Sequence, residues 1–159
     1  MPGTRPTLSP ALIYRDPKAA LAFLERAFGF SPLMIITDDK GQIVHSEMTL
    51  GDGLIMVGYE WGAEYKSPAS VDGKTTQTLH VHLESDVDAH CAAARAAGAE
   101  IVMEPADQFY GDRSYRARDP EGHLWTFSQT KQALSPAEWD KAGGGLKTWV
   151  RPGSVYDVG

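Results

Sequence analysis

Residues 16–30 read DPKAALAFLERAFGF, and residues 85–99 echo them as SDVDAHCAAARAAGA. Asp16 has the side chain of a helix N-cap, Pro17 suits the first helical position, and apolar residues then recur at helical spacing. A glycine follows each run, at Gly29 and Gly98, where a helix commonly ends in a left-handed residue. The two stretches therefore predict two equivalent helices in one chain.

A second pair of glycines supports a repeated unit. Gly53 closes a turn before an apolar run in the first half of the chain, and Gly122 does so in the second half. These two glycines are 69 residues apart, and so are Gly29 and Gly98. One constant offset over this distance indicates two copies of a unit with few or no gaps inside it.

The other segments of each unit have the pattern of strands. The clearest is residues 79–83, where leucine and valine alternate with His80 and His82. Each copy is then β-α-β-β-β and about 50 residues long, too short to bury its own sheet face, so the two copies should pack together. The predicted strands are residues 11–14, 30–36, 42–50 and 54–59 in the first copy and 79–83, 99–104, 114–118 and 123–129 in the second.

These elements predict an α+β fold of two tandem β-α-β-β-β modules plus a C-terminal extension. Residues 1–129 form a single domain in this interpretation, and residues 130–159 form a C-terminal helix and arm. Within the domain, module one covers residues 8–61, a linker covers 62–76, and module two covers 77–129.

The extension has a helix signal of its own. Residues 135–138 read SPAE, a capping box with proline at the first helical position, so a short helix carrying Trp139 should begin there. Three glycines at 143–145 end it, and residues 146–150 suit an extended arm. This tail is either a frayed terminus or a segment whose Trp139 and Trp149 dock on another surface. We favour docking, because two exposed tryptophans in a frayed tail would be unusual.

Composition limits the classes of function. The chain has 159 residues, 42% of them hydrophobic and 23% charged, with a formal net charge of −6, so a nucleic-acid partner is not expected. No apolar run approaches the roughly 20 residues that span a bilayer, and the start has no signal-peptide segment, so neither a membrane nor secretion is expected. One cysteine, Cys91, allows no internal disulfide, and we read the protein as cytoplasmic.

Two stretches near the end of module two are the most specific. Residues 108–115 read QFYGDRSY and residues 119–127 read DPEGHLWTF. With the tandem modules, they resemble the vicinal oxygen chelate superfamily, which includes glyoxalase I, extradiol dioxygenases and bleomycin-resistance proteins. The resemblance covers about residues 8–129. It implies a curled mixed sheet around a cleft, with metal ligands on the first and last strand of each module.

The residues at those ligand positions depart from the family pattern. They fall at Ser9, at Met56 or Val57, at Thr78 or Leu79, and at Thr126. None is a histidine or glutamate, and a thioether with neutral hydroxyls is a poor ligand set for a divalent ion. The resemblance therefore points to the metal-free, bleomycin-resistance-like branch, which binds and sequesters a small molecule without a cofactor.

An alternative is a metal site at a displaced position. His45 and Glu47 share one strand face, as do His80 and His82, and converging faces would give three imidazoles and a carboxylate for one divalent metal ion. The protein would then be a glyoxalase- or dioxygenase-like metalloenzyme. Otherwise the same four residues line a wet sheet face and orient a ligand by hydrogen bonds.

Aromatic and cationic side chains complete the candidate site. Trp61, Tyr110 and Trp125 could stack on a flat, aromatic small molecule. Arg113 either presents a cation to an anionic ligand or braces its own turn. We also expect a homodimer, because the sheet edges and the tail tryptophans have no obvious partner within one chain. In such a dimer the tail would lie across the neighbouring subunit.

Overall fold

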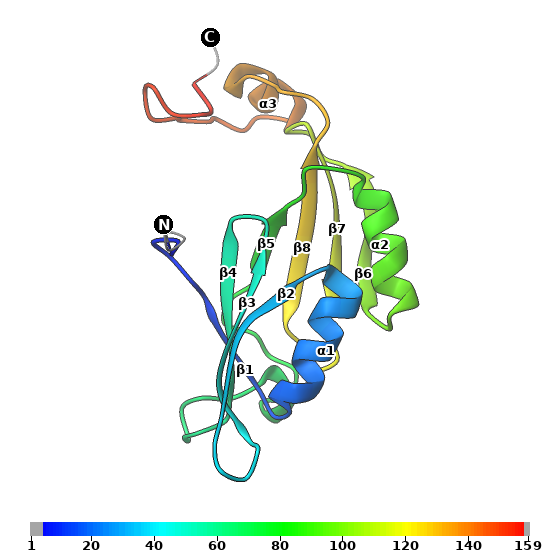
Figure 1. The fold of residues 1–159 in the computed structure, drawn as a ribbon. Helices are drawn as coiled ribbons and strands as arrows, with labels where there is room; N and C mark the ends of the chain where they lie inside the picture. The colour runs from blue at the N-terminus through cyan, green and yellow to red at the C-terminus, as the bar shows by residue number, and fades with distance from the viewer. Residues whose placement is uncertain (1–4, 158–159) are drawn as a thin grey trace.

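The computed structural model describes residues 5–157 (Figure 1). Two mixed, four-stranded sheets carry the fold, and each belongs to one β-α-β-β-β module, as the repeat predicts. No helix among the described residues is long and apolar enough to cross a membrane. Module one contains β1 (Ala11–Tyr14), α1 (Pro17–Phe28), β2 (Ser31–Thr37), β3 (Ile43–Leu50) and β4 (Gly53–Tyr59); module two contains β5 (Leu79–His82), α2 (Val87–Ala96), β6 (Glu100–Asp107), β7 (Asp112–Arg118) and β8 (Leu124–Thr130).

The two sheets have the same topology. The strand order is β1-β4-β3-β2 in the first and β5-β8-β7-β6 in the second. In each sheet the first strand pairs with the last strand in parallel, and the other pairs are antiparallel hairpins. Because the helix lies between the first and second strands of a module, it crosses the sheet and covers one face.

The predicted helix caps are present. The carboxylate of Asp16 accepts a 3.0 Å hydrogen bond from the Ala19 N–H, and Gly29 ends α1 with a left-handed φ of 80°. In α2 the carboxylate of Asp86 accepts from the Ala89 N–H in the same way. Both helices therefore begin where the sequence places an aspartate, because its oxygen satisfies a free N–H of the first turn.

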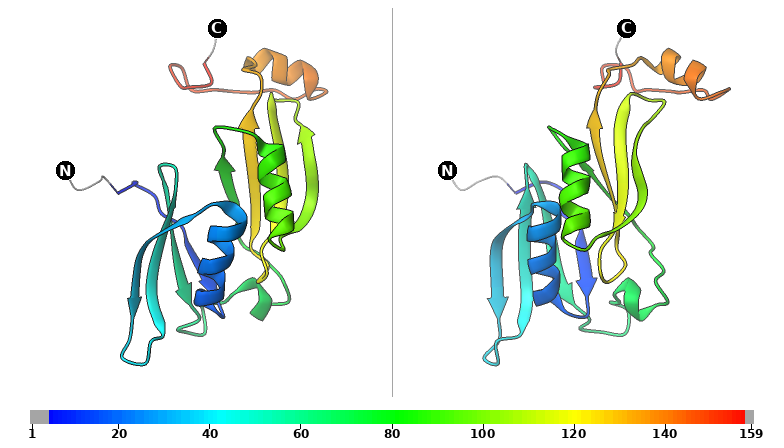
Figure 2. Two further views of the ribbon diagram at one scale, coloured as in Figure 1. Left: turned by 45° about the vertical axis from the view of Figure 1, so that its right-hand side comes forward. Right: turned by 90° about the vertical axis from the view of Figure 1, so that its right-hand side faces the viewer.

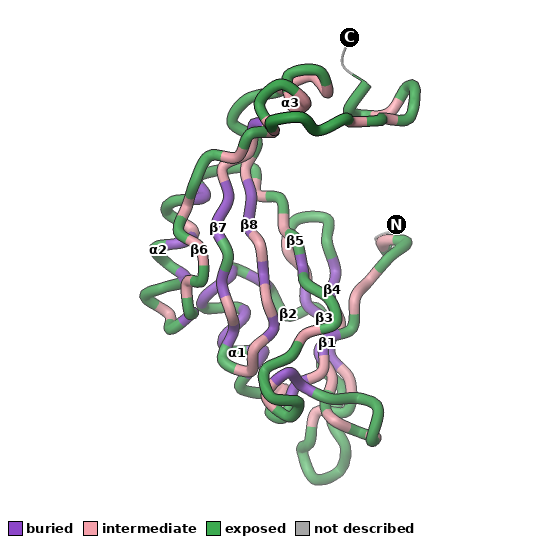
Figure 3. Tube along the Cα trace, turned by 180° about the vertical axis from the view of Figure 1, so that it is seen from behind, coloured by how far each residue is buried: buried purple, intermediate pink, exposed green. Residues whose placement is uncertain are grey.

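The modules share one core. Helices α1 and α2 lie next to each other on the same side of the sheets (Figures 1 and 2). The Phe28 ring of α1 lies 5.3 Å from the Trp125 ring and 4.8 Å from the Phe127 ring of β8. On the opposite face the strands themselves form the surface (Figure 3). Neither module could bury its apolar residues as completely alone.

The extension begins at the end of β8 and carries α3 (Pro136–Ala142). Its capping box forms as predicted, since the Ser135 side chain and the Glu138 side chain each bond the other residue's backbone N–H. Residues 146–150 form no strand. Trp139 has partners within its own chain, contrary to our expectation: its Nε1–H donates to the Tyr110 carbonyl, and its ring packs against Tyr156. Trp149 remains 80% exposed.

A candidate ligand-binding cavity

A row of polar side chains lies on the open face of the second sheet. Alternation along β5 turns Leu79 and Val81 toward the core and His80 and His82 to the open face. The pairing register places His82 opposite Ser128 of β8, and Asp112 of β7 opposite Thr130. We call this set the polar floor; its members are His80, His82, Asp112, Ser128 and Thr130.

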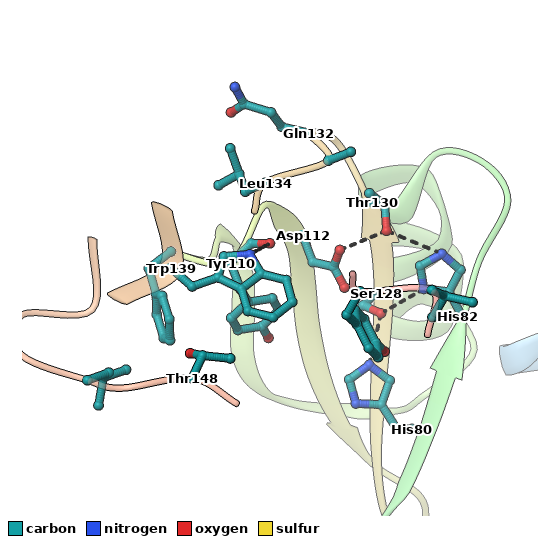
Figure 4. Close-up of a pocket in the computed structure, with 15 residues that line it drawn as sticks. His80, His82, Tyr110, Asp112, Ser128, Thr130, Gln132, Leu134, Trp139 and Thr148 are labelled. Carbon is teal, nitrogen blue, oxygen red and sulfur yellow. Dashed lines mark hydrogen bonds between the residues drawn. The ribbon is translucent and has the colours of Figure 1, made fainter. Parts of the chain in front are cut away.

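Hydrogen bonds connect the polar floor from one end to the other (Figure 4). The Thr130 hydroxyl donates to Oδ1 of Asp112 over 2.8 Å, and Nε2 of His80 lies 2.8 Å from the Ser128 hydroxyl. His82 lies between them, with contacts of 3.4 Å to Ser128 and 3.5 Å to Thr130. Such long contacts are weak, so the His82 ring keeps hydrogen-bonding capacity for a ligand.

Aromatic side chains stand beside the polar floor. Phe109 and Tyr110, at the turn between β6 and β7, meet edge to face, with ring centres 5.2 Å apart. Trp139 of α3 and Tyr156 of the last segment form a second edge-to-face pair at 5.7 Å. We call these four rings the aromatic wall. The polar floor and the aromatic wall border an open cavity of about 810 Å³, which is large enough for a drug-sized molecule.

Gly111 docks the extension against this turn. Its carbonyl accepts hydrogen bonds of 3.0 Å from the N–H groups of Lys131 and Gln132. Its φ is +98°, and a Cβ added there would lie 2.0 Å from the Gln132 carbonyl oxygen. Only glycine allows both this conformation and this close approach of two backbones. The bond from Trp139 to the Tyr110 carbonyl then fixes α3 over the same turn.

The cavity contains three of the residues that the sequence suggests as ligand contacts: His80, His82 and Tyr110. Trp125 lies elsewhere. Its side chain is fully buried in the core, where its Nε1–H donates to Asp119, so it offers no surface for stacking. Because Trp125 and Phe127 occupy the helix-facing side of β8, the open side belongs to Ser128 and Thr130.

Trp61 and Arg113 also lie away from the cavity. Trp61 follows β4 and stacks on Tyr65, with ring centres 3.7 Å apart. Arg113 donates to both oxygens of Asp88 on α2 and to Asp107 at the end of β6. These bonds, led by the one to Asp88, raise the pKa of the guanidinium. Of the two roles that the sequence suggests for Arg113, the structure shows the bracing one, through the carboxylates of Asp88 and Asp107.

His45 and Glu47 belong to the first sheet. The Glu47 carboxylate is 2% exposed, accepts a bond from Arg5, and lies 3.3 Å from Nε2 of His45. Desolvation raises the pKa of Glu47, but the bonds from His45 and Arg5 outweigh it and leave the pKa below its ordinary value. Glu47 lines a separate hollow of about 640 Å³ beside Met34 and Leu54.

The displaced four-residue metal site is not assembled. His45 and Glu47 lie on module one, whereas His80 and His82 lie on module two. Within residues 5–157 there is no group of three or more histidine, cysteine, aspartate or glutamate side chains that could hold a metal ion.

Sequence reasoning missed part of the site. It did not include Asp112, Ser128 and Thr130, although Trp125 and Phe127 alternate with polar residues in the middle of β8, which is a signal for one polar face. The place of Trp139 beside Tyr110 has no comparable signal, since it depends on the contact between Gly111 and Gln132.

Comparison with known proteins assigns the family. The sequence profile described as the glyoxalase/bleomycin resistance protein/dioxygenase superfamily matches residues 8–127. The chain belongs to this superfamily. The match includes both modules as far as Phe127 in β8, with His80, His82 and Asp112 of the polar floor, and it ends before Ser128, Thr130 and the extension.

Several known proteins are similar to this superfamily member over most of the length of both chains. Uncharacterized protein Mb0911c of Mycobacterium bovis is 32% identical over 137 residues, which cover 84% of this chain and 89% of the relative. The crystal structure of TioX from Micromonospora sp. ML1 is 36% identical, with a TM-score of 0.62, and covers 82% of this chain and 100% of TioX. A superfamily enzyme from Burkholderia phytofirmans PsJN is 21% identical, with a TM-score of 0.58, and covers 77% of this chain and 97% of that one; this likeness shows the fold alone.

The residues that the family resemblance places at the metal positions do not fit a divalent ion. Thr126 pairs with His80, so this pair supplies one imidazole and one hydroxyl. Met56 pairs with Ala11 on one side and Glu47 on the other, and Glu47 is already bonded by Arg5. One imidazole, a hydroxyl and a thioether are not the nitrogen and carboxylate set that such an ion requires.

Proposed function

We propose that this protein binds a small organic molecule in the cavity between the polar floor and the aromatic wall, and releases it unchanged. One observation carries the proposal: the cavity combines a connected row of hydrogen-bonding groups with four aromatic rings. Such a combination orients a ligand through its polar edge and stabilises it through its flat faces. This activity corresponds to the bleomycin-resistance-like interpretation of the sequence.

The chemistry of the lining supports binding over catalysis. The Ser128 hydroxyl and Nε2 of His80 are 2.8 Å apart, a distance that also occurs between a serine nucleophile and its general base. Ser128, however, is fully buried beneath the imidazoles, so a substrate could not reach its hydroxyl. Among the described residues no carboxylate bonds to His80 to orient it as a base. The pair is better suited to holding the His80 ring in place.

Binding to a panel of planar aromatic compounds tests the proposal. Equilibrium dialysis should find a compound that is retained by the protein and recovered unchanged, as judged by mass spectrometry. His80→Ala should weaken retention, because it removes a ring from the polar floor. His45→Ala, on the other sheet, is the matched control and should retain the compound like the wild type. Conversion of the compound, or equal retention by both variants, contradicts the proposal.

We further propose that the protein works as a homodimer in the cytoplasm. The free thiol of Cys91 is buried, which is compatible with a reducing compartment. The outer strand of the first sheet, β2, has three exposed apolar side chains, Leu33, Ile35 and Ile36. An apolar sheet edge of this kind favours contact with a second copy.

A further inference from the structure

We propose that the C-terminal extension determines ligand specificity, and that the preferred ligand is a planar aromatic ring bearing a positive charge. This inference rests on the proposed binding function and goes beyond it by naming the selecting element and the ligand class.

The extension supplies half of the cavity. Eight of the 15 residues that line it follow Thr130 (Figure 4). The superfamily match ends at residue 127, so these residues lie outside the part of the chain shared with that profile. The strands that carry the polar floor, β5, β7 and β8, belong to the two-module fold, whereas the rings of Trp139 and Tyr156 are additions of the extension. The extension therefore determines which ligands are selected by contact with those two rings.

The extension is held in a defined position. Two backbone N–H groups, those of Lys131 and Gln132, donate to the Gly111 carbonyl. Trp139 donates to the neighbouring carbonyl of Tyr110 over 3.1 Å and is half-buried. These three bonds keep the Trp139 ring beside Tyr110, across the cavity from His80 and His82 (Figure 4). A ring fixed in this way costs little conformational entropy when a ligand stacks on it.

The charge of the lining indicates the ligand class. In the part of the chain that the structure describes, the cavity lining contains one carboxylate, Asp112, and no lysine or arginine. Oδ1 of Asp112 accepts from Thr130, and within residues 5–157 its Oδ2 receives no hydrogen bond. A carboxylate flanked by aromatic faces attracts an organic cation both by charge and by the negative ring faces. An anionic ligand would meet the Asp112 carboxylate with no lysine or arginine in the described lining to offset the repulsion.

Three acridines provide matched probes for calorimetric titration of the full-length protein. They are 9-aminoacridine, which is protonated at neutral pH, acridine, which is neutral, and acridine-9-carboxylate, which is anionic. We expect affinity to fall in that order, with the cation about fivefold tighter than the neutral ring, because a partly exposed ion pair contributes up to about 1 kcal/mol. Asp112→Asn should abolish this preference and leave the neutral acridine unaffected.

Variants of the extension test its role. Trp139→Ala should weaken all three probes about tenfold, since it removes a ring and releases α3. Tyr156→Ala, which leaves the bond to Tyr110 intact, should weaken them several-fold. Trp149→Ala is the matched control, because this tryptophan of the same segment does not line the cavity, and it should bind like the wild type.

The outcomes separate the two proposals. If Trp139→Ala, Tyr156→Ala and Asp112→Asn all bind 9-aminoacridine like the wild type while His80→Ala loses it, the role of the extension is overturned and the binding function stands. If no acridine binds but another compound is retained through His80, the ligand class is overturned and the binding function again stands. If no compound of the panel is retained, both proposals fail.

Discussion

The hydroxyl of Tyr14 donates a 2.7 Å hydrogen bond to Oδ2 of Asp119, joining the first strand of module one to the turn before the last strand of module two. The same oxygen accepts from Nε1 of Trp125, and Oδ1 accepts the N–H groups of Glu121 and His123. Both Tyr14 and Asp119 are buried. One carboxylate thus shapes the turn and ties it to the other module.

Removing the Tyr14 hydroxyl should weaken this connection. We expect Tyr14→Phe to lower the free energy of unfolding by roughly 1–2 kcal/mol, because a buried bond to a charged acceptor is lost. Asp119→Ala should cost more, about 3 kcal/mol, since it leaves several buried donors unpaired. Urea denaturation followed by far-UV circular dichroism measures both. Tyr59→Phe, at an exposed tyrosine on β4, is the control, and an equal loss there would contradict the role of Asp119.

Features that depend on neighbours in the sequence could be predicted. The caps at Asp16 and Gly29, the repeat and the capping box of α3 use contacts within a few residues, and all are present. Alternation placed His80 and His82 on one face, but it could not decide which aromatic residues face the core. Trp125 is buried because Phe28 of the other module packs on it, a contact between residues far apart in the chain.

The stability of the protein should depend on pH through His90. This histidine of α2 is half-buried and contacts α1 of the other module. Its Nε2 donates to the Phe28 carbonyl over 3.0 Å, so Nδ1 can accept from the Tyr115 hydroxyl over 2.6 Å. Burial lowers the pKa of His90 in spite of the bond to Phe28. Tyr115 and Cys91 are its titratable neighbours, and burial raises the pKa of each.

The sign of the effect follows from these directions. The unfolded chain, with an ordinary histidine pKa near 6.5, binds more protons than the folded one as the pH falls through that value. The free energy of unfolding should therefore be lower at pH 5.5 than at pH 7.5. Urea titrations at both values measure the difference, and His90→Gln should reduce it. His82→Gln, which changes an exposed ring, is the control and should leave the difference between the two pH values unchanged. If His90→Gln shows the same difference as the wild type, groups other than His90 cause the pH dependence.

Gly111→Ala should release the extension without unfolding the domain. The new methyl group would lie 2.0 Å from the Gln132 carbonyl, so the two backbones must separate. We expect limited proteolysis to cut after residue 130 much faster than in the wild type, while the circular dichroism of the sheets persists. Gly144→Ala is a matched control at another left-handed glycine, where the Cβ would meet nothing within 4 Å. Equal protease resistance of Gly111→Ala and the wild type would contradict the docking.

Purified protein should hold no stoichiometric divalent metal. Ser9, Met56 and Thr126, which the family resemblance places at the ligand positions, offer only hydroxyl and thioether groups. Elemental analysis after dialysis should therefore find no more zinc, nickel, manganese or iron than in a Glu47→Gln variant. One equivalent of any of these ions that survives dialysis in the wild type, and is lost in the variant, would support the metalloenzyme alternative.

The homodimer should form through β2 of the first sheet. β2 lies at the sheet edge and carries no charged residue, and its Leu33, Ile35 and Ile36 are 45–58% exposed. The equivalent edge of the second sheet, β6, contains three acidic side chains, which oppose pairing with another strand. The docking of Trp139 within its own chain removes one reason to place the tail at the interface, so β2 is the better candidate.

Sedimentation velocity at tens of micromolar tests this interface. We expect the wild type to sediment as a dimer and Ile35→Lys as a monomer, because a buried lysine without a partner opposes association. Val102→Lys places the same charge on β6, at a residue of similar exposure, and should leave the dimer intact. Trp149→Ala tests whether the exposed arm also contributes. A monomeric wild type would refute the dimer, and a dimer that persists in Ile35→Lys would place the contact on another surface.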